Sequence, residues 1–219
     1  MQWAIIFDVD GVIADTEALN ARASVLMFDE LYGTKVQPED FREFVGTGDE
    51  RYVEGVAEKY GVEINTEAAV ERRKESFFKL MERQPLPAMP GVLAIVQTAR
   101  VSADVKLAIA TSGNSDKQFP VIHGAGLRLE WFDVVVTGDD VTRKKPDPQI
   151  YQITAEKLGL PPARCVVLED APAGVAAAKA AGAVCVAVTS SVDADRLGEA
   201  DLVVASLAEV SVAQMRRMV

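Results

Sequence analysis

Short apolar runs, each about as long as one β-strand, recur along this chain and constrain its fold more than any other feature. The runs are AIIF (4–7), VKLAIAT (105–111), FDVVVTG (132–138), CVVLED (165–170) and AVCVAV (183–188). Periodic or alanine-rich segments separate the later runs, at 90–103, 146–159 and 171–182. Strands that are apolar on both faces and alternate with helices are typical of a parallel sheet covered by helices on both sides. We therefore expect an α/β fold.

Residues 17–83 follow a different pattern from the rest of the chain. They contain no strand-like run, and their apolar residues recur at helical spacing between glycines. This pattern predicts a helical domain at 16–87, inserted into a sheet domain made of 1–15 and 88–219. The chain would cross between the domains near 14–17 and 84–90. Two crossings form a natural hinge, so we expect the domains to open and close.

Charge and cysteine content limit the partners and the compartment. The chain has 23 basic and 33 acidic residues, a net charge of −10, which argues against a nucleic-acid partner. No apolar run reaches the roughly 18 residues of a membrane span. Asp8 and Asp10 interrupt any apolar signal-peptide core. Cys165 and Cys185, each beside valines, fit reduced core thiols. We expect a cytoplasmic protein without a membrane partner.

Polar residues follow several of the predicted strands, at the points where these strands end. They are Asp8 and Asp10 after the first, Thr111, Ser112 and Gly113 after the second, Lys145 after the third, and Glu169 and Asp170 after the fourth. Each group alone has a structural explanation, such as a turn or a helix cap; Asp147 and Pro148, for example, predict a helix start. In open α/β sheets, however, ligands bind at the carboxyl ends of the strands. All four groups at one sheet edge therefore favour a functional site.

These residue types together suit phosphoryl transfer. Three or four carboxylates from two strand ends form a hard oxygen site for Mg²⁺. One carboxylate can act as a nucleophile and form an aspartyl-phosphate, while a second transfers protons. A hydroxyl, backbone N–H groups and a lysine can then neutralise the phosphoryl oxygens.

Four segments resemble the motifs of the haloacid dehalogenase superfamily, in its phosphatase and phosphomutase branch with a helical cap. The segments are FDVDGVIADTE (7–17), IATSG (109–113), KKPDP (144–148) and VLEDAPAGVAAAKAAG (167–182). The resemblance implies a Rossmann-like parallel sheet core with an inserted α-helical cap domain. It implies these roles: Asp8 as nucleophile, Asp10 as general acid and base, Thr111 and Lys145 as phosphoryl ligands, and Asp8, Asp10, Glu169 and Asp170 around Mg²⁺. Because Asp10 is present, dehalogenation is disfavoured.

The relatives implied by this resemblance include sugar-phosphate phosphatases and β-phosphoglucomutase, and the cap should decide between them. Asn20 stands where the mutase-like pattern has histidine, Asp49 where it has arginine, and Asn114 where it has a basic residue. We therefore expect a phosphatase acting on a small phosphorylated metabolite, with a phosphomutase or a regulatory protein on the same fold as alternatives. The expected substrate contacts are Glu17, Thr47, Gly48, Arg51, Lys74, Ser112, Gly113 and Asn114. The sequence does not decide the oligomeric state.

Overall fold

The computed structural model describes residues 1–84 and 86–219, and a parallel sheet of six strands forms its centre. The strands are β1 (Trp3–Phe7), β2 (Val105–Ala110), β3 (Val134–Val136), β4 (Cys165–Glu169), β5 (Val184–Val188) and β6 (Leu202–Val204). Their order across the sheet is β3-β2-β1-β4-β5-β6, and every neighbouring pair is parallel. The predicted α/β fold is confirmed, and its first strand lies inside the sheet.

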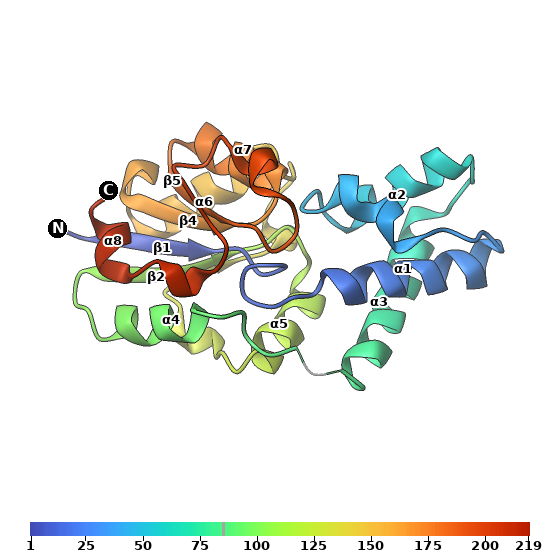
Figure 1. Ribbon diagram of the computed structural model, residues 1–219, viewed down its shortest axis with the longest axis horizontal. Helices are drawn as coiled ribbons and strands as arrows, with labels where there is room; N and C mark the ends of the chain where they lie inside the picture. The colour runs from blue at the N-terminus through green and yellow to red at the C-terminus, as the bar shows by residue number, and fades with distance from the viewer. Residues whose placement is uncertain (85) are drawn as a thin grey trace.

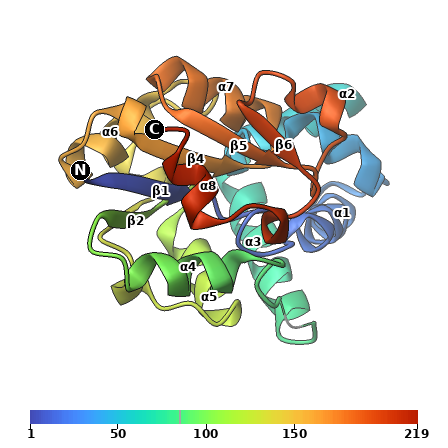
Figure 2. The same ribbon diagram turned by 60° about the vertical axis from the view of Figure 1, so that its left-hand side comes forward.

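Helices cover both faces of the sheet, as the continuous apolar strands require. Side chains alternate along β1: Trp3, Ile5 and Phe7 belong to one apolar cluster, and Ala4 and Ile6 belong to another on the opposite face. The first cluster includes residues of α4 (Val92–Arg100), α5 (Ser115–Gly124) and α8 (Val212–Arg216), and the second those of α6 (Gln149–Leu158) and α7 (Pro172–Ala181). Figures 1 and 2 show the two layers on either side of the strands.

A helical cap lies beyond the carboxyl end of β1 (Figure 1). It consists of α1 (Glu17–Tyr32), a 3₁₀ segment (Pro38–Phe44), α2 (Asp49–Tyr60) and α3 (Thr66–Met81). Glycines in the left-handed conformation, Gly33 and Gly61, end α1 and α2. The predicted inserted helical cap is confirmed as part of the fold. Its boundaries and hinge stay predictions, and Pro85, within the second predicted crossing, lies outside the described residues.

The cap has an apolar cluster of its own and also packs into the main core. Phe28, Phe41 and Val53 lie in the cap's cluster, which is separate from the two clusters that contain the strands. Leu19 of α1 and Phe77 of α3 instead belong to the same cluster as the odd-numbered residues of β1. Burial of each such side chain stabilises the contact by roughly 1.5–3 kcal/mol. The near ends of α1 and α3 are therefore held against the sheet domain by burial of apolar surface.

Three local features were not anticipated in detail. The strand β6 was not expected, because its three residues are only half-buried and form a short apolar run. Within the predicted helical region, the segment at Pro38–Phe44 forms a 3₁₀ helix. The helix α6 begins at Gln149, one residue later than expected, with Pro148 at the cap position; the Asp147 carboxylate still accepts from the Gln149 N–H at 2.9 Å.

Candidate active site

The candidate site lies where the strand order reverses. The chain runs outward from β1 to β2 and β3, then crosses to β4 on the other side of β1. The loops that follow β1 and β4 therefore diverge and leave a crevice at the carboxyl edge. A cavity fills this crevice beneath the cap; its lining includes Asp8, Asp10, Glu17, Asn20, Gly48, Asp49, Tyr52, Arg73, Thr111, Ser112, Gly113, Lys117, Lys145 and Asp170.

A buried lysine lies between two carboxylates at the base of this cavity. The Lys145 ammonium donates to Asp8 Oδ1 at 2.8 Å and to Glu169 Oε1 at 2.6 Å. The Tyr151 hydroxyl also donates to Glu169 Oε1, at 2.5 Å. Burial alone would lower the pKa of Lys145, but attraction to Asp8 and Glu169 outweighs it and raises that pKa. Lys145 is therefore cationic and holds the two carboxylates in place.

The carboxylates at this edge fit a divalent metal ion. One oxygen each of Asp8, Glu169 and Asp170 lies within 4.8 Å of the other two. Burial raises the pKa of Asp8 to about 7, with Lys145 opposing the shift, and burial together with Glu169 raises the pKa of Asp170 well above its usual value. Three carboxylates buried beside one lysine leave an excess of negative charge at this edge. A hard cation with oxygen ligands would balance this charge, and Mg²⁺ is such a cation.

Asp10 stands above this cluster and receives hydrogen bonds on both of its carboxylate oxygens. The Thr16 hydroxyl donates to Oδ1, and the Gln118 side-chain amide donates to Oδ2 at 2.7 Å. Asn20 Nδ2 in turn lies 3.4 Å from the Thr16 hydroxyl oxygen. Asp10 is thus bonded directly to Gln118 of α5 in the core and is linked through Thr16 to Asn20 of α1 in the cap.

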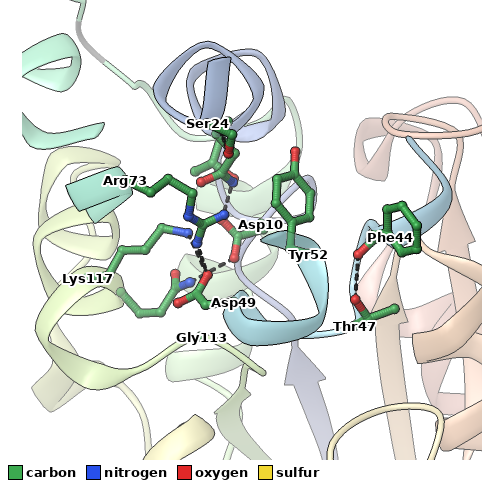
Figure 3. A network of polar contacts seen from close by, with 12 residues as sticks. Asp10, Ser24, Phe44, Thr47, Asp49, Tyr52, Arg73, Gly113 and Lys117 are labelled. Atoms are coloured by element: carbon green, nitrogen blue, oxygen red, sulfur yellow. Dashed lines mark hydrogen bonds and ion pairs between the residues drawn. The ribbon is translucent and has the colours of Figure 1, made fainter. Parts of the chain in front are cut away.

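The upper part of the cavity contains an ion cluster that the sequence did not reveal. Arg73 of α3 and Lys117 of α5 both face Asp49, the first residue of α2; Arg73 bonds Asp49 directly, and the Lys117 ammonium lies 3.6 Å away (Figure 3). Burial opposes ionisation of Asp49, but Arg73 and Lys117 hold its pKa well below the usual value. Aromatic rings support both cations: Tyr52 lies 5.0 Å from the Arg73 guanidinium, and Phe77 lies 5.0 Å from the Lys117 ammonium.

The predicted substrate contacts divide into two groups. Glu17, Gly48, Ser112 and Gly113 line the cavity. Arg51 is half-exposed and pairs with Glu58 at 2.8 Å, Thr47 donates to the Phe44 carbonyl, and Lys74 and Asn114 line a separate cavity beside α3. Lys74 pairs there with Glu71 and Asp116. For the residues of this second group, contact with substrate stays a prediction.

Comparison with known proteins shows which family this chain resembles. The family model described as "Haloacid dehalogenase-like hydrolase" matches residues 5–188. Among curated proteins, the chain is 38% identical over 86% of its length to SUPPRESSOR OF QUENCHING 1 of Arabidopsis thaliana, although it spans only 18% of that protein. It is 36% identical to the phosphorylated carbohydrates phosphatase of Thermotoga maritima, over 82% of this chain and 81% of that protein. The crystal structure of CbbY from Rhodobacter sphaeroides in complex with phosphate is 31% identical, with a TM-score of 0.84 over 98% of this chain and 99% of that one.

Proposed function

The chain belongs to the haloacid dehalogenase-like hydrolase family, and from this premise we propose that it hydrolyses a small sugar phosphate through an aspartyl-phosphate intermediate with Mg²⁺ as cofactor. The predicted assignment to this family is confirmed, as is the assignment as a phosphatase, since relatives are named as phosphatases. The observation that carries the mechanism is the arrangement of Asp8, Lys145 and Asp170 at the sheet edge, with Asp10 above them.

In the first step we assign the nucleophile to Asp8. Lys145 binds Asp8 Oδ1, so the other carboxylate oxygen is the one that attacks phosphorus. A bond forms between this oxygen and phosphorus, the ester P–O bond breaks, and Asp10 gives its proton to the leaving oxygen. Thr111, buried at the end of β2, and Lys145 offer donors to the phosphoryl oxygens.

In the second step water removes the phosphoryl group from Asp8. Asp10, now a carboxylate, takes a proton from the water, whose oxygen attacks phosphorus, and the bond between phosphorus and Asp8 breaks. This returns Asp8 as a carboxylate and Asp10 as an acid. Mg²⁺, held by Asp8 and Asp170, would neutralise negative charge on the transferred group throughout. Glu169 would orient Lys145, because both of its oxygens already accept protein hydrogen bonds.

The leaving group would lie against the cap side of the cavity. This side offers both acceptors and donors, including Glu17, Arg73 and Lys117. Hydroxyl groups can bond to either kind of partner, which suits a sugar. The name of the Thermotoga maritima relative points to the same substrate class. Because the cap closes over the cavity, the substrate is a small molecule.

The helices and cysteines bear on where the protein is located. Within the described part of the chain, no helix has the length and apolar character needed to cross a bilayer. A cytoplasmic location remains a proposal, based on the two buried free cysteines.

The test is release of inorganic phosphate from a panel of sugar phosphates in the presence of Mg²⁺. We expect Asp8→Asn to abolish release, since an amide cannot form the acyl phosphate. Asp15→Asn is the matched control, because this exposed residue of the same segment lies outside the cavity lining. Residual activity of Asp8→Asn within tenfold of wild type would contradict the mechanism. Conversion of a sugar 1-phosphate to its 6-phosphate without phosphate release would identify the phosphomutase alternative instead.

A further inference from the structure

Gln118 is a completely buried polar residue that the mechanism above does not use. It lies in the first turn of α5, and its side-chain amide donates to Asp10 Oδ2 at 2.7 Å across 108 residues of sequence. Its Oε1 atom has no hydrogen-bond partner among the described residues. A buried amide with one unpaired atom destabilises the folded state. The bond to Asp10 therefore calls for an explanation beyond packing.

The main chain leaves room for this side chain at Gly113. A Cβ atom on Gly113 would lie 2.1 Å from Gln118 Nε2 and 2.9 Å from its Cδ atom. The backbone of Gly113 is not left-handed, so other residues could adopt its conformation. Glycine is needed here because the Gln118 amide passes directly over it. Gly113 was expected to contact substrate; its packing against Gln118 gives it a second role.

The chemistry of an amide decides what this contact does to Asp10. An NH₂ group only donates, so Asp10 Oδ2 can only accept in this arrangement. The opposite oxygen, Oδ1, faces the Thr16 hydroxyl, which can rotate and can either donate or accept. Only Oδ1 is thus free to exchange a proton. Asp10 is itself only half-buried, so packing alone does not fix the rotation of its carboxylate.

We propose that Gln118 is a positioning residue for Asp10: together with Gly113, it fixes the carboxylate so that Oδ1 delivers the proton to the leaving oxygen. This inference rests on the proposed phosphatase function and extends it to a residue of α5. Loss of the contact leaves Asp10 present but misoriented. Protonation of a poor leaving group then suffers most, because a good leaving group departs without a proton.

The experiment compares three monoesters of similar size: benzyl, phenyl and p-nitrophenyl phosphate. The need to protonate the leaving group decreases from benzyl to phenyl to p-nitrophenyl phosphate. The value of kcat/KM reports on the reaction up to and including transfer of the phosphoryl group to Asp8. For Gln118→Met we expect kcat/KM to fall about 100-fold with benzyl phosphate, as for a misplaced catalytic group, and less than about threefold with p-nitrophenyl phosphate. Gln152→Met, on the exposed face of α6, is the matched control and should change neither value.

Gly113→Ala should push the Gln118 amide away from Asp10. This variant keeps the proposal testable if Gln118→Met does not fold. It should produce the same dependence on leaving group, and the double variant should lose no more than the worse single variant, because both changes break one contact. An equal loss of kcat/KM with all three esters, or no loss, would overturn the inference. Turnover by the wild-type protein in the same experiment would leave the proposed function intact. Wild-type protein that hydrolyses neither these esters nor the sugar phosphates would overturn the proposed function itself.

Discussion

The ion cluster between cap and core leads to a stability prediction for Asp49→Asn. The substitution keeps the size of the side chain and removes its charge. Arg73 and Lys117, whose side chains are 3% and 4% exposed, would then lack their shared counter-ion. Removing one partner of a buried ion pair costs roughly 3–5 kcal/mol. Because the amide oxygen of asparagine still accepts a hydrogen bond from Arg73, we expect the lower end, about 3 kcal/mol.

This loss should be visible as a fall in melting temperature. For a chain of this length, 1 kcal/mol corresponds to roughly 2–4 °C, so Tm should fall by about 6–12 °C at pH 7. The matched control is Asp29→Asn, which breaks an ion pair of 2.6 Å on the exposed face of α1. Exposed pairs contribute about 0–1 kcal/mol, so the control should lower Tm by no more than about 4 °C.

The pH dependence separates a charge effect from a packing effect. The pKa of Asp49 is lowered in the folded protein, so its stabilising charge is complete above its ordinary value of 3.8 and is lost as the pH falls below that value. The difference in Tm between wild type and Asp49→Asn should therefore be constant from pH 7 to 5 and shrink below pH 4. A shift no larger than that of the control, or one that persists unchanged at pH 3, would refute the electrostatic explanation.

Other predictions concern metal, the cap surface and the lysine support. EDTA should abolish phosphate release, Mg²⁺ should restore it and Ca²⁺ should inhibit, because Ca²⁺ takes more ligands at longer distances; full activity in EDTA would contradict the metal site. If Arg51 and Lys74 contact the substrate as predicted, replacing either by Ala should lower kcat/KM for sugar phosphates roughly 10- to 150-fold; a change of less than about threefold would show that they only pair with surface carboxylates outside the cavity. Gly174→Ala should lower activity and Tm together, since a Cβ there would lie 1.9 Å from Glu169 Oε1; unchanged Tm would show that Glu169 moves freely.

The sheet and the base of the site were predictable because each depends on local sequence. Continuous apolar runs identified the strands β1 to β5, and the polar residues that follow them were expected to meet at one edge of a parallel sheet. β6 was not predicted, because three half-buried residues at the edge of the sheet do not form a distinctive sequence pattern. A strand at the edge of a sheet pairs with only one neighbouring strand. It can therefore form from a shorter apolar run than a central strand.

The upper part of the cavity was not predictable in the same way. Arg72, Arg73 and Lys74 are three consecutive basic residues on α3, so the sequence does not distinguish between them. A helix turns by about 100° per residue, so only the packing of α3 decides which of them faces the site. Lys74 was expected to contact the substrate, whereas the structure buries Arg73 in the cavity and leaves Arg72 paired with Glu30. Lys117 and Gln118 likewise depend on how α5 is placed against the cap.

The packing of Leu19 and Phe77 into the core cluster sets limits for laboratory evolution of this enzyme. Phe77 supports both the cap contact and the Lys117 ammonium above its ring, so a library that varies Phe77 would select on folding before it selects on substrate. Asn20 and Tyr52 line the cavity without belonging to that cluster. Diversity placed at these two positions would reshape the pocket and leave the Leu19 and Phe77 contacts in place, but at Tyr52 it would also alter the cap's own apolar cluster.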